Sequence, residues 1–242
     1  MCGRYALVKS AGELIEEFEI TTNRIPAALP ADWNIAPTRE IYVIRNSPSD
    51  NSRELATLSW GMIAPWSKDR SEAVRSQSQA INARSESVHE KPTFRSAFKS
   101  RRCLIPASGY YEWATALGKY SPKQPFYISS SKTRSLPIAG IWSTWKSMEG
   151  EIIQSAAIIT REAVGDLATI HSRMPVMMPQ DRWDAWLDPS QHDVELLISL
   201  MSNPQPDDGL FARPVSSEVN LVRNNSPRLI EPITLGEPET LF

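Results

Sequence analysis

Short apolar runs rich in β-branched and aromatic residues recur along this chain, and no long helical segments alternate with them. Each run has the length and composition of a β-strand. The runs cover residues 41–45, 55–60, 102–106, 110–114, 125–129 and 152–160. Met148, Glu149 and Gly150 separate two strand-like runs with a turn-forming sequence, which indicates a hairpin. Because successive strands of a parallel sheet need long, usually helical crossovers, the pattern predicts an α+β fold on an antiparallel or mixed, barrel-like sheet.

Several helices are expected to flank this sheet. Ser10 and Glu13 have the spacing of a capping box ahead of apolar residues, which predicts a helix over residues 11–19. Two later segments keep the helical period of apolar side chains, and they cover residues 181–187 and 191–201. Ser190 is the expected cap of the second of these helices.

The chain is expected to form a single domain. Neither an internal repeat nor a long low-complexity linker divides it, and the segment Asn203–Gly209 is a loop by composition. We therefore expect one domain over residues 1–232 and a C-terminal tail over residues 233–242. A chain of 242 residues buries a sizeable core without disulfide staples.

Composition narrows the class of protein. Two cysteines do not make a disulfide framework, which indicates a reducing compartment. No run approaches the ~20 apolar residues of a membrane span, and acidic residues appear by Glu13 where a signal peptide would be apolar. We therefore expect a cytoplasmic protein that is neither secreted nor embedded in a membrane.

Charge is distributed unevenly along the chain. Taken over the whole chain, the net charge of −2 argues against nucleic acid as a partner. However, residues 53–103 hold ten Lys and Arg against five Asp and Glu, while residues 181–242 hold four against eleven. The basic stretch includes Trp60, Trp66 and Phe98, and cations with aromatic rings are the groups that single-stranded nucleic acid requires. A solvated basic helix face over core aromatics explains the same pattern.

Cys2 is the most informative residue for chemistry. Removal of the initiator Met leaves it at the N-terminus, with an α-amine of pKa about 8 next to a thiol of pKa about 8.5. The thiol then suits attack on an amide, as in N-terminal-nucleophile hydrolases. Alternatively, the amine condenses with an aldehyde, and the thiol closes a thiazolidine in a favourable intramolecular step. The position is also compatible with an accident of the translation start.

Four other residues carry side chains suited to proton transfer or anion binding. His171 lies between a helical turn and a Pro-led strand, and histidine transfers protons near pH 7. Glu112 lies in an aromatic run, where burial would raise the pKa of its carboxyl and make it a general acid or base. Asn82 and Arg84 share one face if their segment is extended, which places an amide beside a phosphate binder. Each is also compatible with an ordinary surface or core role.

Other kinds of site have no basis in the sequence. The chain contains no C-x-x-C, no H-E-x-x-H and no glycine-rich phosphate loop, so we expect neither a metal nor a nucleotide cofactor. Cys103 lies in an apolar strand and is expected to be an inert core thiol. His89 and His192 lie in polar segments and are expected to be exposed.

Six motifs occur in an order that resembles one protein family. They are Met1–Tyr5, Trp33–Pro37, Trp60–Gly61 with Trp66, Asn82–Glu86, Gly109–Trp113 and His171–Pro175. In this order they resemble the SOS response-associated peptidase (SRAP) family of abasic-site processing proteins, and the similarity continues to Pro232. One departure is visible: the family's proline between the two tryptophans stands one place later here, at Pro65, which affects the expected placement of DNA.

The resemblance implies a function and roles for individual residues. It implies that the protein removes its own Met1 and that Cys2 then forms a thiazolidine with an abasic site in single-stranded DNA. Glu112 and His171 would shuttle protons, and Asn82 would hold Cys2 and the sugar. A set of DNA contacts is also implied, made of Arg4, Arg84, Trp66, Pro37 and Thr160. The resemblance also implies a monomer that needs no cofactor or metal. The protein would act in the cytoplasm, on damaged DNA, during the SOS response. A lyase activity at abasic sites is compatible with the resemblance.

Three alternatives stay open at this point. An N-terminal-nucleophile amidohydrolase also begins with Met-Cys-Gly, a thiol peptidase acting in trans would pair Cys2 with His171, and a non-covalent module would bind single-stranded DNA without an adduct. Hydrolysis of glutamine would indicate the amidohydrolase, and cleavage of unrelated peptides would indicate the peptidase. A salt-sensitive complex without an adduct would indicate the non-covalent module.

Overall fold

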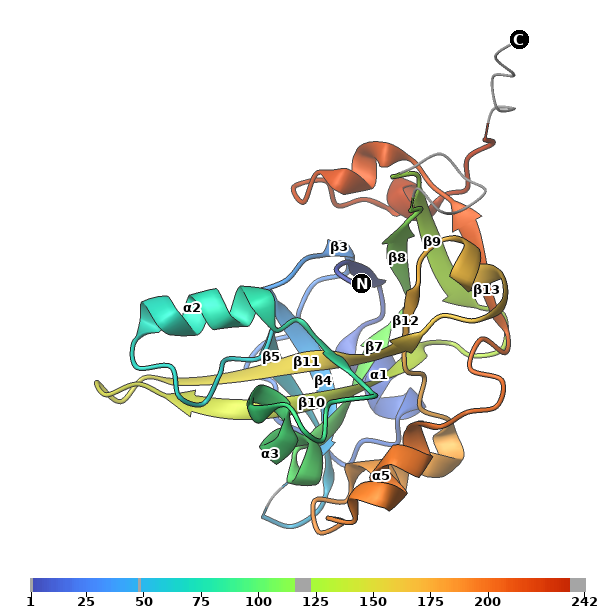
Figure 1. The fold of residues 1–242 in the computed structure, drawn as a ribbon. Coiled ribbons are helices and arrows are strands. Elements are labelled where there is room, and N and C mark those ends of the chain that lie inside the picture. Colours follow the sequence, from blue (N-terminus) through green and yellow to red (C-terminus); the bar gives the residue numbers. More distant parts are fainter. Residues whose placement is uncertain (1, 48, 116–122, 236–242) are drawn as a thin grey trace.

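A closed five-stranded barrel forms the centre of the protein, and it confirms the predicted α+β class (Figure 1). The computed structural model describes residues 2–47, 49–115 and 123–235. The barrel strands are β4 (Glu40–Asn46), β5 (Arg53–Trp60), β7 (Arg102–Ala107), β10 (Leu136–Lys146) and β11 (Ile152–Glu162). They are hydrogen-bonded in the order β5-β4-β7-β10-β11 and are antiparallel. A parallel pairing of β11 with β5, through Ser155↔Ser59 and Ala156↔Trp60, closes the ring.

Three short strands extend this sheet at its edges. They are β2 (Thr22–Asn23), β6 (Asn82–Arg84) and β12 (Arg173–Pro175). Strand β6 runs parallel to β11 just beyond the point where β5 leaves it, with Asn82 opposite Ile158 and Arg84 opposite Thr160. Strand β12 pairs antiparallel with the last residues of β11. The end of β11 therefore collects short segments from distant parts of the chain.

A second, antiparallel sheet stands beside the barrel. Its strands, in the order β13-β9-β8-β1-β3, are Leu210–Pro214, Pro125–Ser130, Gly109–Trp113, Tyr5–Leu7 and Asp32–Ile35. Tyr5 pairs with Tyr110, so the start of the chain runs next to β8. In Figure 1 the N-terminus lies between the barrel and the β8–β9–β13 part of this sheet.

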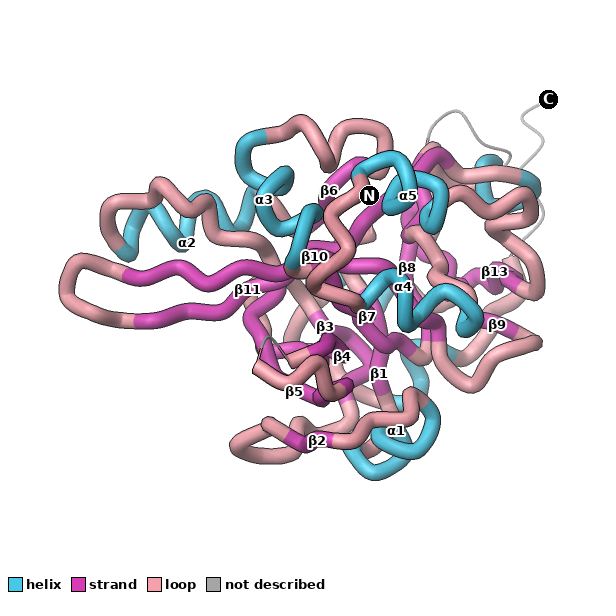
Figure 2. Tube along the Cα trace, turned by 90° about the horizontal axis from the view of Figure 1, so that it is seen from below, coloured by secondary structure: helices cyan, strands magenta, loops and turns pink. Residues whose placement is uncertain are grey.

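Helices cover the outside of the barrel (Figure 2). The α-helices are α1 (Ala11–Glu17), α2 (Arg70–Gln79), α3 (Pro92–Ser100), α4 (Trp183–Leu187) and α5 (Val194–Met201). The 3₁₀ turns are η1 (Gly165–Thr169), η2 (Gln180–Arg182), η3 (Ser217–Asn220) and η4 (Pro227–Ile230). Gly61 explains how α2 packs so closely: its φ is +108°, and a Cβ there would lie 2.3 Å from the Gln77 carbonyl oxygen. No helix in the described ranges is long and apolar enough to cross a membrane.

Most elements expected from the sequence are present. The capping box of Ser10 and Glu13 is formed, although α1 ends at Glu17. All six strands exist within about two residues of their expected bounds, and residues 148–150 form the β10–β11 turn. The expected cap of the last α-helix was wrong: Asp193, not Ser190, accepts from the amides of residues 195 and 196, so α5 begins at Val194. Helices α2 and α3 were missed. Helix α2 is polar and carries little apolar periodicity. In α3 the residues Phe94, Ala97 and Phe98 do keep the helical spacing, and this signal was overlooked.

Candidate functional site

Cys2 lies in the interior, between the second sheet and the edge of the barrel. Its side chain has no solvent exposure. Asn82 Nδ2 donates a hydrogen bond of 2.9 Å to the Cys2 carbonyl oxygen, and the amide of Tyr111 donates to the Arg4 carbonyl oxygen at 2.9 Å. Residue 2 is thus held from one side by β6 and from the other by β8. Burial raises the pKa of the Cys2 thiol, and the negative charge of Glu112 raises it further, so the thiol keeps its proton at neutral pH.

Glu112 is a buried carboxyl on β8, the neighbour of the strand that follows Cys2. Of the two environments left open by the sequence, the buried one is found, with 3% of the residue exposed. Removal from water raises the pKa of this carboxyl from 4.5 to about 7. At neutral pH the group therefore exchanges a proton with little free-energy cost in either direction, which is the property of a general acid–base catalyst.

His171 approaches the same region from the segment that precedes β12. The amide of Thr115, three residues after Glu112, donates to the carbonyl oxygen of Ile170 at 3.0 Å, which ties this segment to the end of β8. Partial burial lowers the pKa of His171, so the imidazole is neutral at pH 7. The amide of Arg173 donates to Nδ1 at 3.0 Å, so Nδ1 is an acceptor and the ring proton resides on Nε2.

Arg84 and Thr160 face each other in the β6–β11 pairing. Arg84 is exposed, whereas Thr160 has only 1% of its surface exposed. The Thr160 carbonyl oxygen accepts from Arg173 Nη2 at 2.7 Å. Arg173 also forms a two-pronged ion pair with Glu86, at 2.8 and 2.9 Å. Sequence reasoning missed this pair, although both residues stand inside the quoted motifs with opposite charges.

Arg4 is already engaged within the protein. Its Nη1 donates to Asn34 Oδ1 at 2.7 Å and to the Val219 carbonyl oxygen at 3.0 Å, and its guanidinium lies 5.9 Å from the centre of the Trp113 ring. Asn34 was not singled out from the sequence. It is fully buried, and its Nδ2 donates to three carbonyl oxygens of residues 219, 221 and 224. Together Arg4 and Asn34 join the start of the chain to its C-terminal part.

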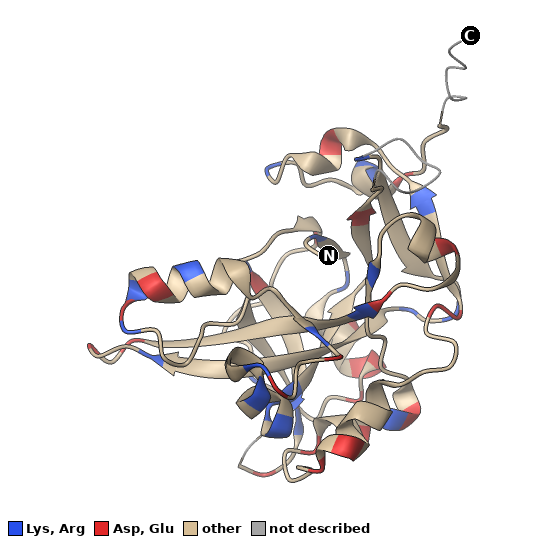
Figure 3. Ribbon diagram, viewed as in Figure 1, with Lys and Arg blue, Asp and Glu red and all other residues tan. Residues whose placement is uncertain are grey.

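Trp66 and Pro37 lie outside this hydrogen-bonded cluster. Trp66 is 57% exposed in the loop between β5 and α2. Pro37 follows β3 and is partly buried. Of the other aromatic residues in the basic stretch, Trp60 and Phe98 are fully buried, so the interpretation of these two as core residues is correct. Figure 3 shows the cations of this stretch concentrated on α3 and, mixed with acidic residues, on α2.

The residues excluded from chemistry mostly behave as expected. Cys103 is fully buried in the barrel. His192 is exposed, but His89 keeps only 25% of its side chain in water, so its predicted exposure was wrong. Among the described residues, no group of three or more His, Cys, Asp or Glu has the geometry to hold a metal ion.

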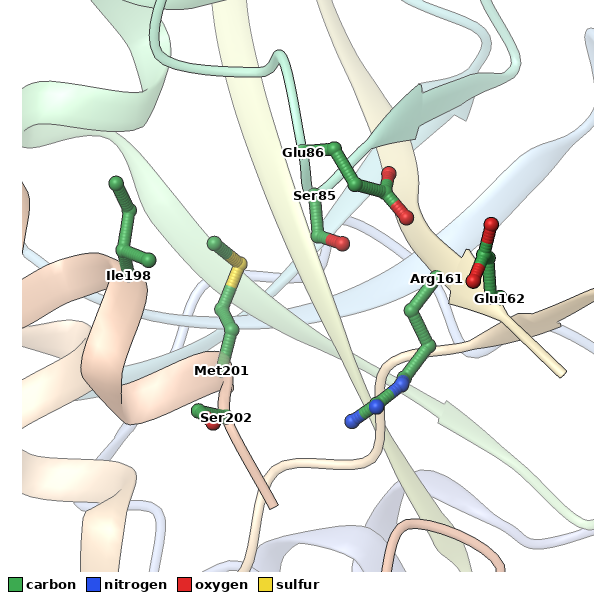
Figure 4. A pocket seen from close by; sticks show the side chains of 7 residues that line it. All are labelled: Ser85, Glu86, Arg161, Glu162, Ile198, Met201 and Ser202. Carbon is green, nitrogen blue, oxygen red and sulfur yellow. The ribbon is translucent and has the colours of Figure 1, made fainter. Parts of the chain in front are cut away.

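A pocket of about 270 Å³ lies next to the Glu86–Arg173 pair and apart from Cys2 (Figure 4). It is lined by Ser85, Glu86, Arg161, Glu162, Ile198, Met201 and Ser202. None of the four residues expected to do chemistry contributes to it. The buried cluster around Cys2, rather than this pocket, is therefore the candidate functional site.

Comparisons with known proteins agree with the order of motifs. The family model described as SOS response associated peptidase (SRAP) matches residues 1–222. Abasic site processing protein YoqW of Bacillus subtilis is 37% identical over 231 residues, which cover 96% of this chain and 99% of the relative. Abasic site processing protein HMCES of Rattus norvegicus is 31% identical over 211 residues, which cover 76% of this chain and 58% of the relative.

Solved structures have the same fold. A crystal structure of a protein from Bacteroides thetaiotaomicron matches with a TM-score of 0.81 at 22% identity, covering 96% of this chain and all of the other chain, and this likeness bears on the fold alone. A crystal structure of a protein from Bordetella bronchiseptica matches with a TM-score of 0.72 at 30% identity, covering 89% of this chain and all of the other.

Proposed function

This chain belongs to the SOS response associated peptidase (SRAP) family, and we propose that it processes abasic sites in DNA by forming a covalent adduct through Cys2. The relatives YoqW and HMCES are both named abasic site processing proteins. The observation that carries the proposal is the cluster in which Asn82 fixes the Cys2 backbone while a carboxyl of pKa about 7 influences its thiol.

The reaction begins with hydrolysis of the peptide bond between Met1 and Cys2. This step consumes one water molecule and leaves a free α-amine on Cys2 next to its thiol. Glu112 assists as the acid–base group, since its buried carboxyl both accepts and releases a proton near pH 7. The hydrogen bond from Asn82 Nδ2 to the Cys2 carbonyl oxygen holds residue 2 in place before and after the cut.

The adduct then forms in two steps. The α-amine attacks the aldehyde of the ring-opened deoxyribose, and loss of one water molecule gives an imine. The thiol adds its sulfur to the imine carbon, its proton passes to the nitrogen, and a thiazolidine results. His171 presents Nε2–H, so it donates a hydrogen bond to the departing oxygen, and the protonated form of the Glu112 carboxyl supplies the proton that this oxygen requires. Glu112, now a carboxylate, relays the thiol proton from sulfur to nitrogen, because burial keeps the thiol protonated until it reacts.

The DNA is expected to be single-stranded at the abasic site. Arg84 is exposed next to the cluster and neutralises a phosphate. The exposed ring of Trp66 offers a surface for an unstacked base. Arg4, Pro37 and Thr160 complete the proposed contacts, with Arg4 acting through its charge because its Nη1 is engaged by Asn34.

The raised pKa of the Cys2 thiol argues against a peptidase that acts in trans. Such an enzyme needs a thiolate close to its base. Here burial raises the pKa of the Cys2 thiol, so the thiol keeps its proton at neutral pH. A thiazolidine pathway does not need a preformed thiolate, because the amine reacts first.

The test combines intact-mass measurement with a denaturing gel. The purified protein is expected to lose one Met and, after incubation with an abasic single-stranded oligonucleotide, to gain the mass of one oligonucleotide in a band that resists denaturation. Cys2→Ala is expected to abolish this band. Cys103→Ala is the matched control, because it removes the other buried thiol, which lies inside the barrel. Equal adduct formation by Cys2→Ala would overturn the proposal.

A further inference from the structure

Helix α3 carries a row of cations on one face. Lys91, Arg95 and Lys99 follow one another at intervals of four residues, and all three are exposed. Arg95 and Lys99 lie inside the helix, where residues four apart share a face and are separated by about 6 Å along the axis at 1.5 Å per residue. Lys91 is the N-cap residue immediately before the first turn. The opposite side of the helix is anchored in the core by Ala97 and Phe98. These three residues are called the α3 cationic row.

The row has no neutralising partner among the described residues. None of its three members takes part in an ion pair within 4.0 Å there. Helix α3 itself contains no acidic residue, and the adjacent Glu90 faces His89 at 3.5 Å. Like charges four residues apart destabilise a helix. In a chain of net charge −2, such a row is a cost to folding that a bound polyanion relieves.

The row follows the proposed DNA contacts in the chain. Strand β6 ends at Arg84, next to the Cys2 cluster, and the chain then leads through residues 85–91 into α3. Figure 2 shows α3 next to β6, whereas in Figure 1 α3 lies on the other side of the β10–β11 hairpin from the start of the chain. Figure 3 shows only cations on α3. The joining segment contains Glu86, which is paired with Arg173, and Glu90, so the α3 cationic row is a separate group of cations one short segment beyond Arg84.

The chemistry of α3 favours phosphates over bases. Its two aromatic rings belong to Phe94, which is partly buried, and Phe98, which has no exposure, so neither offers an open face for base stacking. We propose that the α3 cationic row is a second DNA-contact surface, which binds the phosphate backbone of the strand as it continues past Arg84 from the abasic nucleotide. The inference rests on the proposed function, because that function brings the DNA to Arg84.

The test measures binding against salt concentration for short and extended oligonucleotides. The variant is Arg95→Gln/Lys99→Gln, and the control is Arg134→Gln, which removes an exposed cation that lies beside acidic residues of α1. Three fluorescent DNAs carry one abasic nucleotide each: a short oligonucleotide, one extended on the 5′ side and one extended on the 3′ side. Binding is also measured with each extension annealed to a complementary strand. This comparison shows whether the row contacts the phosphates of single-stranded or of double-stranded DNA.

We expect the double variant to bind one extended DNA more weakly than the parent protein does. Each lost phosphate contact lowers the slope of log K against log salt by roughly 0.7 on a single strand, so two contacts lower it by about 1.4. Affinity for the short oligonucleotide is expected to stay as in the parent, and the melting temperature is expected to stay the same or rise slightly because a repulsion between like charges is removed. Arg134→Gln is expected to change neither slope. A smaller salt dependence of binding by the double variant, with either the paired or the unpaired extension, supports the proposal that the α3 cationic row contacts DNA.

The outcomes separate this inference from the proposed function. An unchanged slope with both extended DNAs overturns the inference, as does an equal loss with the short oligonucleotide. If no denaturation-resistant adduct forms with any DNA while the slope still falls, the proposed function fails and the α3 cationic row remains a DNA-contact surface.

Discussion

Replacing Glu112 by Gln tests the energetics of the site independently of any reaction. In the folded protein burial raises the pKa of Glu112 from 4.5 to about 7. Below pH 4.5 the carboxyl is protonated in both the folded and the unfolded chain and contributes no pH dependence. Between pH 4.5 and 7 the unfolded chain ionises first, so the folded state binds more protons and the free energy of unfolding falls as pH rises. Each pH unit across this window is worth about 1.4 kcal/mol, so the loss reaches about 3 kcal/mol by pH 8.

Glutamine has nearly the same shape and does not ionise. The Glu112→Gln protein is therefore expected to lack this part of the pH dependence and to gain about 3 kcal/mol relative to the parent between pH 4.5 and pH 8. Urea unfolding followed by tryptophan fluorescence at several pH values measures the difference. Glu162→Gln, an exposed carboxylate at the end of β11, controls for the exchange of a carboxyl for an amide.

Parallel stability curves for the parent and Glu112→Gln would refute the reasoning. They would mean that the carboxyl ionises in the folded state as readily as in water, and the acid–base role proposed for Glu112 would lose its physical basis. If the curves diverge as expected, the variant is also expected to slow adduct formation with abasic DNA while keeping most of its affinity for intact single strands. Such a variant would be more stable and less active, as expected where a buried ionisable group serves function at the expense of stability.

Three further predictions concern the remaining site residues. Asn82→Ala removes the hydrogen bond to the Cys2 carbonyl oxygen. We expect adduct formation to slow at least tenfold, because a positioning contact worth about 1.4 kcal/mol or more is lost. Denaturing gels measure the rate of adduct formation. His171→Ala is expected to slow adduct formation without changing affinity for intact single-stranded DNA in a polarisation assay; equal loss of both, with a lowered melting temperature, would indicate a folding defect instead. Trp66→Ala is expected to weaken single-strand binding by about 1–3 kcal/mol, the usual worth of a stacked base. Met148→Ala, which removes an even more exposed apolar side chain on the β10–β11 turn, should leave the binding unchanged.

Much of the fold was predictable where the signal is local. The capping box at Ser10 and Glu13 and the turn at residues 148–150 follow from residues close in sequence, and both are present. The strands that close the barrel were also recognisable from their β-branched and aromatic runs. Helix α3 was missed although Phe94, Ala97 and Phe98 keep the helical spacing, because the segment has only nine residues and depends on packing against the core for its stability.

Predictability of the site differs from residue to residue. Cys2 was identifiable because its two nucleophiles follow from its position in the chain and require no fold. The polar character of Glu112 was visible in the sequence, but its role depends on a pKa that the sequence does not determine. The pair of Glu86 and Arg173 lies 87 residues apart in sequence, so no local pattern connects the two.

The sequence by itself determined the covalent chemistry and the local conformations. It placed a thiol and a prospective amine on one residue, and it specified strands, turns and caps through side chains a few positions apart. Only the tertiary structure decided which groups meet: β6, β8 and the segment before β12 bring residues 82, 112 and 171 around the start of the chain. It also decided that burial raises the pKa of Glu112 to about 7 and that Trp66, unlike Trp60, faces water. The physical reason is that desolvation and exposure depend on the atoms surrounding a group, and here those atoms come from strands that only folding brings together.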